Sequence, residues 1–222
     1  DIMDEEFDKK VERTKNRPIA SGKISKKLGL IYALILCCLA FLVLINFNLL
    51  TIILALSSIP LAFTYPLMKR YTYWPQLFLG IIFNYGLILG WFSINNNFDI
   101  APLIFYIGAI FWTLGYDTIY GFQDIKDDEI IGVKSTSIKF KKNPHKFLVI
   151  CYLVFIICIL VTGILMKFNY LFFMFSIIPT LHLINYQIKN LQINNPKSCF
   201  NIFKSNNAFG FIIFINILIG KL

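Results

Sequence analysis

Seven long apolar stretches alternate with short polar segments along this chain. Each stretch has close to the roughly 20 residues that a helix needs to cross about 30 Å of hydrocarbon. We therefore predict an all-α fold, a polytopic transmembrane helical bundle in which residues 1–222 form one membrane domain. The predicted membrane helices are 27–46, 49–67, 77–94, 101–120, 147–166, 169–188 and 206–221.

Composition agrees with this pattern. Hydrophobic residues make up 57% of the chain and charged residues 15%, whereas soluble domains are about 45–50% apolar and about 25% charged. The five cysteines form no CxxC pair and four of them lie in apolar stretches, so we interpret them as small hydrophobic residues rather than metal ligands or redox groups.

The net charge of +9 raises the possibility of a nucleic-acid partner, and the positions of the basic residues exclude it. Nineteen of the 21 Lys and Arg residues lie in segments 9–27, 69–70, 126–146 and 189–204. If the helices alternate in direction, these segments share one side of the membrane, which the positive-inside rule assigns to the cytoplasm or the matrix. The partner that the sequence indicates is the lipid bilayer, and no protein partner is indicated.

Acidic residues are concentrated in two windows, 1–12 and 117–129, which hold eleven of the twelve. Helical spacing places Asp1, Asp4 and Asp8 on one stripe. Asp117, Asp124 and Asp128 also share a helix face. Stacked carboxylates repel unless a cation lies among them, and oxygen ligands without His or Cys favour Mg²⁺, which often shares its remaining ligands with phosphates. For either window alone, a solvated acidic helix end remains the alternative interpretation.

Basic side chains accompany both acidic windows. We expect them to neutralise a diphosphate leaving group together with Mg²⁺; the alternative is that they only set membrane topology. These residues are Arg13, Arg17, Lys69, Arg70 and Lys134.

Three segments resemble, in order, the landmarks of the UbiA prenyltransferase family. DIMDEEFDKKVERTKNRPIASG resembles its first signature, TYPLMKRYTYWPQLFLG an intervening landmark, and YDTIYGFQDIKDDEIIGVKST the second signature in its 4-hydroxybenzoate version. Gly121 stands where Ala is more usual. The family has about nine membrane helices, so the resemblance implies that this chain carries seven of them and lacks the first helix and most of the second.

The resemblance implies a Mg²⁺-dependent transfer of a polyprenyl group from polyprenyl diphosphate to the ring of 4-hydroxybenzoate, in ubiquinone biosynthesis, at a bacterial or mitochondrial inner membrane. The implied metal ligands are Asp1, Asp4, Asp8, Asp124 and Asp128. The implied substrate-binding residues are Arg13, Arg17, Tyr65, Lys69, Arg70, Asp117, Tyr120 and Lys134. Asp124 and Arg70 are the expected catalytic residues.

Three other functions remain open. A related prenyltransferase acting on homogentisate, a naphthoate or haem would keep the metal site and change the acceptor pocket. A carboxylate-lined cation transporter would explain the acids near the membrane but not the bases beside them. A non-catalytic remnant is the third.

Four polar or small positions inside the apolar stretches have structural interpretations. Gly86 and Gly90 form a small-xxx-small pair suited to close helix packing. His182 and Asn84 are expected to hydrogen-bond neighbouring helices rather than to act on a substrate.

Overall fold

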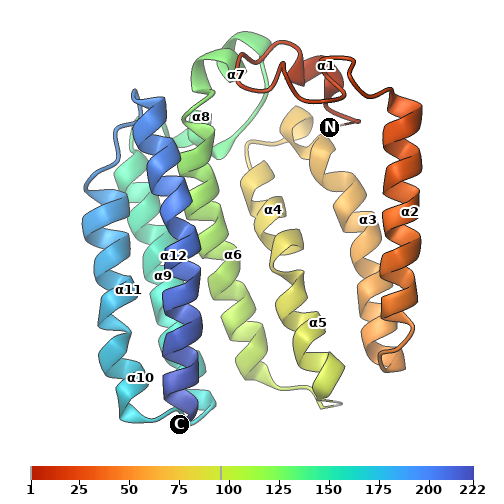
Figure 1. The fold of residues 1–222 in the computed structure, drawn as a ribbon. Helices are drawn as coiled ribbons and strands as arrows, with labels where there is room; N and C mark the ends of the chain where they lie inside the picture. The colour runs from red at the N-terminus through yellow and green to blue at the C-terminus, as the bar shows by residue number, and fades with distance from the viewer. Residues whose placement is uncertain (1, 96) are drawn as a thin grey trace.

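The structure, a computed structural model, describes residues 2–95 and 97–222, and the regular secondary structure within them is all helical (Figure 1). Seven helical segments are long and apolar enough to span a membrane, which confirms the predicted number. The segments are α2 (Lys26–Leu44), α3 (Leu49–Tyr71), α4 with α5 (Pro75–Phe83 and Tyr85–Ile94), α6 (Ile100–Gly121), α9 (Pro144–Leu165), α10 to η1 (Tyr170–Phe175, Ile177–Leu181 and His182–Ile188) and α12 (Pro196–Lys221).

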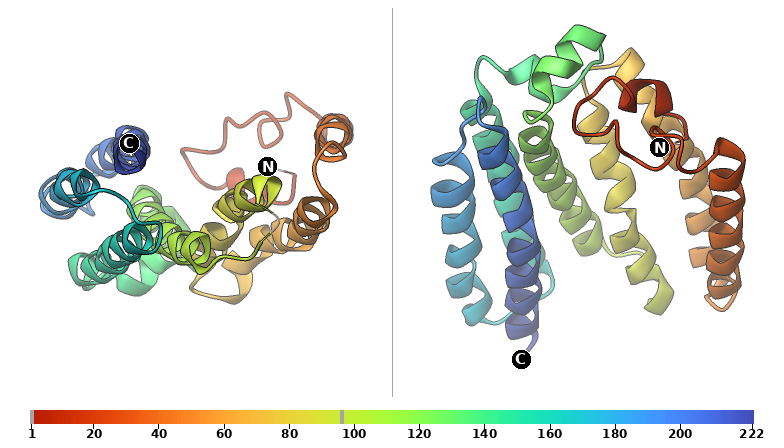
Figure 2. Two further views of the ribbon diagram at one scale, coloured as in Figure 1. Left: turned by 90° about the horizontal axis from the view of Figure 1, so that it is seen from below. Right: turned by 45° about the horizontal axis from the view of Figure 1, so that its top comes forward.

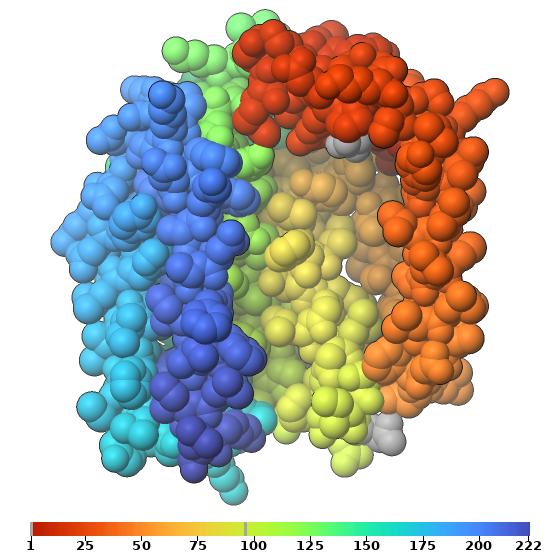
Figure 3. All heavy atoms as spheres, in the orientation of Figure 1, coloured from red at the N-terminus to blue at the C-terminus, as the bar shows by residue number. Residues whose placement is uncertain are grey.

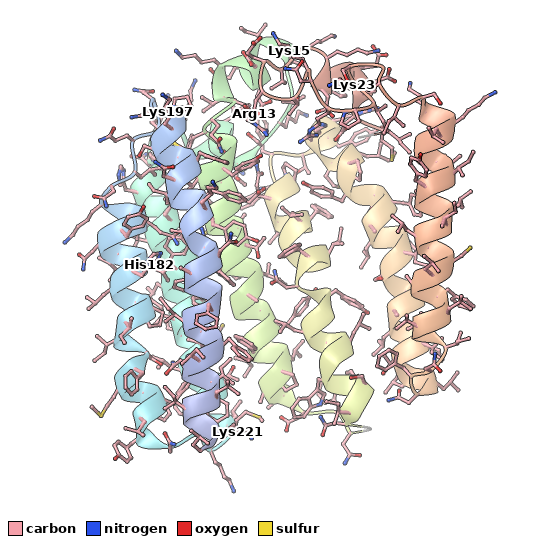
Figure 4. The ribbon with its side chains drawn as sticks, in the orientation of Figure 1. Arg13, Lys15, Lys23, His182, Lys197 and Lys221 are labelled. Atoms are coloured by element: carbon pink, nitrogen blue, oxygen red, sulfur yellow. The ribbon has the colours of Figure 1, made fainter. Side chains whose placement is uncertain are left out.

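Three short helices lie outside the membrane segments, at one end of the bundle (Figure 1). They are α1 (Glu5–Asp8), α7 (Ile125–Ile131) and α8 (Thr136–Phe140). The basic residues collect at the same end: Arg13, Lys15, Lys23 and Lys197 lie there, whereas Lys221 lies at the opposite end (Figure 4).

Helix α12 begins ten residues before the predicted start at 206. Pro196 occupies its first turn, and the Asn195 side chain accepts a hydrogen bond from the Ser198 amide at 3.2 Å, a helix-capping contact. The first three turns are rich in Lys, Ser and Asn. The hydropathy pattern therefore predicted only the apolar part of this helix.

Close packing of α6 on α9 forms the centre of the structure. Glycines on α6 permit this approach, because a Cβ on Gly115 would lie 2.4 Å from the Tyr152 ring, and one on Gly108 would lie 2.7 Å from Cys158 Cβ. The neighbouring core is largely aromatic, with Phe155 on α9 and Phe209 on α12 almost completely buried.

A polar network ties the last two membrane segments to this centre. Asn206 Oδ1 accepts from Trp112 Nε1 at 2.8 Å and from Gln187 Nε2 at 2.9 Å, and Gln187 accepts from the Tyr152 hydroxyl. Gln187 lies in η1, a π-helical stretch. His182 contacts Ser205 Oγ at 3.1 Å, and Asn84 donates to Thr113 Oγ1 at 2.7 Å, so both side chains bond neighbouring helices as predicted.

Seen end-on, the long helices follow an open arc from α2 to α12 (Figure 2, left). Figure 3 shows a hollow between α12 and α2, with α4 and α5 behind it and the N-terminal segment above it. This arrangement places the N-terminal segment over the end of the hollow at which the basic residues collect.

Candidate active site

A cavity of about 430 Å³ lies beneath the N-terminal segment at the basic end of the bundle. The ends of α3, α4 and α6, together with the segment through α7, form its other walls. Eleven residues that the sequence singled out line it: Asp4, Asp8, Arg13, Arg17, Tyr65, Lys69, Asp117, Tyr120, Asp124, Asp128 and Lys134. The two acidic windows, separated by more than 100 residues, therefore face one space.

The first acidic window is held by ion pairs rather than by a long helix. Only Glu5–Asp8 is helical, so the expected stripe of carboxylates is limited to one turn. Lys69 Nζ lies 2.8 Å from Asp4 Oδ1, and Arg17 Nη1 lies 3.0 Å from Asp8 Oδ2. Asp8 is 6% exposed. Asp1, the remaining predicted ligand of this window, lies outside the described residues.

The second window begins with Asp117 inside α6, and Asp124 precedes the first turn of α7. The Arg13 guanidinium binds both oxygens of Asp124 through Nε, at 3.0 and 2.9 Å, and donates from Nη1 to the Tyr120 hydroxyl at 2.6 Å. The Glu12 amide also donates to Asp127 Oδ2 at 3.2 Å. These contacts fasten the N-terminal segment across the cavity to α6 and α7.

Asp128 differs from the other cavity carboxylates that lie outside the membrane segments, Asp4, Asp8 and Asp124, each of which has an ion-pair partner. No ion-pair partner for it is present within residues 2–95 and 97–222. Burial, reinforced by the neighbouring charge of Asp124, raises the pKa of Asp128 to about 6. A bound cation would relieve both effects, so Asp128 is a carboxylate suited to a metal ion.

The cavity offers the ligand chemistry of Mg²⁺ without a preformed metal cluster. In the part of the chain that the structure describes, no three His, Cys, Asp or Glu side chains are grouped closely enough to hold an ion. The negatively charged donors that line it are carboxylates, and Mg²⁺ usually takes one or two of these together with water and substrate phosphates. The residues therefore fit a Mg²⁺ that is completed by its substrate.

The structure does not bring Arg70 to this cavity. Its Nη2 donates to the Met3 carbonyl at 3.3 Å, and its guanidinium lies 5.1 Å from the centre of the Phe7 ring. Lys69 and Arg70 are adjacent near the end of α3, and successive helical residues point about 100° apart. Lys69 lines the cavity, whereas Arg70 contacts the N-terminal segment at Met3 and Phe7.

Lys134 reaches the cavity through a turn tied to the end of α3. Its backbone amide donates to the Lys69 carbonyl at 2.8 Å, and its Nζ donates to the Tyr71 carbonyl at 3.2 Å. Gly132, with φ of 80°, provides the left-handed conformation that ends α7 just before it. The predicted basic residues Lys69 and Lys134 are thus held side by side.

Gln76 is a cavity residue that sequence reasoning missed. It is buried in the first turn of α4, and its Oε1 accepts from the Thr136 amide at 3.0 Å. The feature of the sequence that could have identified it is a polar amide side chain within the apolar run PQLFLGIIF. Ser135, which caps α8, also lines the cavity, although it appeared in the sequence only as part of the second motif.

Replacing Gly121 with Ala is expected to destabilise this wall by about 1–3 kcal/mol, because overpacking at a filled site carries a cost of that size. An added Cβ would lie 2.3 Å from Ser137 Oγ, which donates to the Thr118 carbonyl at 2.8 Å. The measurement is thermal unfolding of both proteins in the same detergent.

A second substitution provides the control for this prediction. Ser137→Ala removes the clashing oxygen, so the double variant should lose less stability than the sum of the two single variants. Strictly additive losses would show that this clash does not decide which residue is accepted at position 121.

Comparisons with known proteins agree with this geometry. The model of the UbiA prenyltransferase family matches residues 1–217. The chain is 41% identical to 4-hydroxybenzoate geranyltransferase 2 of Lithospermum erythrorhizon, over all of this chain and 72% of that protein. It is 40% identical to the mitochondrial 4-hydroxybenzoate polyprenyltransferase of Bos taurus, of which it spans 60%.

A solved structure shows the same fold. The apo structure of a UbiA homolog from Aeropyrum pernix K1 superposes with a TM-score of 0.81 at 21% identity, covering all of this chain and 82% of the other. Together with the family match along residues 1–217, these relatives establish that the chain belongs to the UbiA prenyltransferase family.

Proposed function

We propose that this protein transfers a polyprenyl group from its diphosphate to 4-hydroxybenzoate in a Mg²⁺-dependent reaction. The observation that carries the proposal is the cavity in which five carboxylates face four basic side chains contributed by separate segments. The relatives that are about 40% identical, named as 4-hydroxybenzoate prenyltransferases, support the choice of acceptor.

The ion pairs of the cavity suggest how a diphosphate is received. Among the described residues, Arg13 pairs with Asp124, Arg17 with Asp8 and Lys69 with Asp4. A diphosphate arriving with Mg²⁺ offers oxygens to the bases and a cation to the acids, so each partner exchanges one charged contact for another. Because the bases are already gathered around the cavity, little reorganisation is needed when the leaving group accumulates charge.

The proposed reaction breaks the bond between the allylic carbon and the diphosphate oxygen and forms a carbon–carbon bond to the ring position ortho to the hydroxyl. The displaced ring proton leaves to solvent or a carboxylate, and diphosphate is the second product. Bound Mg²⁺ supplies positive charge that neutralises the leaving diphosphate. Asp124 is our candidate for orienting or deprotonating the phenol, since its carboxylate lines the cavity.

Tyr120 contributes an aromatic ring to the cavity wall and packs against Phe203 of α12. The Tyr120 ring lies 4.3 Å from the Phe203 ring, and the Arg13 guanidinium lies 4.8 Å from the centre of Tyr120. Electron-rich ring faces attract cations, so this wall suits a developing allylic cation. The surrounding helices and the N-terminal segment limit the access of water, which would otherwise quench that cation.

Charge asymmetry supports an orientation in the membrane. The cavity lies at the end that carries nineteen of the 21 basic residues. By the positive-inside rule, we place this end in the cytoplasm for a bacterial inner membrane, or in the matrix for a mitochondrial one. Water-soluble 4-hydroxybenzoate would reach the site from that side.

Expression from the complete reading frame, in a host without its own 4-hydroxybenzoate prenyltransferase, tests the proposal. Membranes are incubated with isotopically labelled 4-hydroxybenzoate, Mg²⁺ and a series of prenyl diphosphates, and products are identified by mass spectrometry. The expected product is ring-prenylated 4-hydroxybenzoate, lost on chelation of Mg²⁺. Product from homogentisate or a naphthoate, and none from 4-hydroxybenzoate, would overturn the assigned acceptor.

Mg²⁺ and inorganic diphosphate are expected to bind at least about 10-fold more tightly together than singly, which is a typical coupling for linked sites. When either ion binds alone, it breaks the existing ion pairs and leaves the carboxylates or the basic side chains without a partner. When both bind, Mg²⁺ pairs with the carboxylates and diphosphate pairs with the basic side chains. Calorimetry on the purified protein, corrected for Mg²⁺–diphosphate association in solution, measures the coupling. Equal affinities with and without the second ion would contradict the exchange of contacts.

A further inference from the structure

Gln76 places an unused hydrogen-bond donor at the wall of the 430 Å³ cavity. The side chain lines that cavity although the residue is only 7% exposed. Its Oε1 accepts from the Thr136 amide at 3.0 Å, whereas Nε2 has no hydrogen-bond partner among the described residues. A buried polar group without a partner costs free energy. The Gln76 NH₂ group is therefore suited to a ligand that the cavity receives.

The bond to Thr136 determines which end of the Gln76 amide is free. A backbone N–H can only donate, so the side-chain atom that faces it must be the carbonyl oxygen. The NH₂ group lies beside Gly121 instead, because a Cβ built on Gly121 would lie 3.6 Å from Nε2. Since glycine has no side chain, nothing on residue 121 covers this donor.

Packing at the start of α4 fixes the position of Gln76. Pro75, the first residue of α4, restricts the backbone to a helical φ. Trp74, the residue before it, packs edge-on against Phe140 of α8, with ring centroids 5.7 Å apart. The start of α4 is therefore held against α8, so little reorganisation is needed when a ligand binds Nε2.

The charge near Gln76 favours an anionic ligand. Lys134 lies two residues before Thr136 and also lines the cavity. Within residues 2–95 and 97–222 it pairs with no carboxylate, whereas Arg13, Arg17 and Lys69 each have a carboxylate partner. A free NH₂ donor and a positive charge without a counter-ion together suit an anionic oxygen.

We propose that Gln76 recognises the carboxylate of the aromatic acceptor by donating a hydrogen bond from Nε2, with Lys134 supplying positive charge. The inference rests on the proposed function. The two polar ends of 4-hydroxybenzoate differ, because its hydroxyl can donate a hydrogen bond and its carboxylate can only accept one. Asp124 is an acceptor and suits the hydroxyl, whereas the Gln76 NH₂ group is a donor and suits the carboxylate.

Gln76→Met and Gln76→Glu test the proposal through the binding of labelled 4-hydroxybenzoate to the purified full-length protein, with Mg²⁺ and inorganic diphosphate present. Met removes the whole amide, and affinity should fall by at least about 10-fold, as expected for a lost hydrogen bond to a charged group. Glu keeps an oxygen for the Thr136 amide but replaces the donor with a negative charge, so affinity should fall further. If Gln76 only held Thr136 in place, Glu would be closer to the unmodified protein than Met, and the inference would be overturned.

4-Methylphenol, in which a methyl group replaces the carboxylate, shows whether the effect belongs to that end of the acceptor. Its affinity should change by less than about 3-fold in Gln76→Met, because it offers Nε2 no acceptor. Equal losses of affinity for 4-hydroxybenzoate and 4-methylphenol would overturn the inference.

Gln123→Glu is the matched control for Gln76→Glu. Gln123 follows the end of α6, donates to the Tyr120 carbonyl at 3.0 Å and is not among the described residues that line the cavity. The same added charge should change the affinity for 4-hydroxybenzoate by less than about 3-fold at this position. A loss as large as that in Gln76→Glu would show that charge in this region, rather than the donor on Gln76, controls binding.

Turnover distinguishes failure of the inference from failure of the proposed function. In Gln76→Met, KM for 4-hydroxybenzoate should rise by at least about 10-fold, while KM for the prenyl diphosphate stays within about 3-fold. A rise confined to the prenyl diphosphate would assign Nε2 to that anion and overturn the inference. Absence of prenylated product from the unmodified protein with every acceptor would refute the proposed function, and the binding comparison would still decide whether Gln76 recognises a carboxylate.

Discussion

Replacing Asp124 with Asn should reduce prenyl transfer by about 10²- to 10³-fold, the usual effect of removing one charge-stabilising group from an active site. Asp124 lines the cavity, binds Arg13 through both carboxylate oxygens and is a proposed Mg²⁺ ligand. The amide keeps the size of the side chain and removes its charge. Initial rates at saturating 4-hydroxybenzoate, over a range of Mg²⁺ concentrations, measure the loss.

Glu129→Gln is the matched control for Asp124→Asn. Glu129 belongs to the same acidic window, but it pairs with Lys141 outside the cavity. Neutralising it should leave turnover within about 3-fold, since exposed ion pairs contribute little. Similar losses in both variants would mean that the general charge of the window, rather than the position of Asp124, matters.

Lys69→Ala should lower kcat/KM by about 10²-fold and weaken diphosphate binding, whereas Arg70→Ala should change either quantity by less than about 3-fold. The two residues are neighbours at the end of α3, but only Lys69 lines the cavity, where it lies 2.8 Å from Asp4. Arg70 reaches the Met3 carbonyl instead.

This pair of variants tests whether Arg70, one of the two catalytic residues expected from the sequence, acts in the reaction. Diphosphate binding should be measured alongside turnover, so that a loss of binding can be distinguished from a loss of the chemical step. A larger loss in Arg70→Ala would restore the catalytic role that the sequence assigned to it.

Hydropathy predicted the membrane helices well because each must cover the same thickness of hydrocarbon. It could not place the start of α12, where the polar first turns are helical through the Asn195 cap rather than through burial. It also could not show the break at Asn84 or the π-helical stretch, because both depend on contacts with other helices.

The cavity was partly predictable. Concentrated Asp residues near basic ones indicated where charge would be gathered. The pairing of Arg13 with Asp124, 111 residues apart, is a tertiary contact that no local pattern encodes. Predicting that Lys69 and not Arg70 lines the cavity would require the rotational orientation of α3 about its axis. Predicting the empty space around Gly90 would require the positions of the neighbouring helices.

The π-helical stretch His182–Ile188 has a consequence for how this gene can change in length. Gln187 lies in that stretch, is 0% exposed, and hydrogen-bonds both Tyr152 and Asn206. Deleting one codon there would favour an ordinary α-helix and turn every later side chain of the segment by about 100°. The amide would then leave its partners in the apolar interior. Insertions and deletions should therefore be rejected between 182 and 188 and accepted in the connection near 192–195, a contrast that a deletion scan read out by membrane expression would reveal.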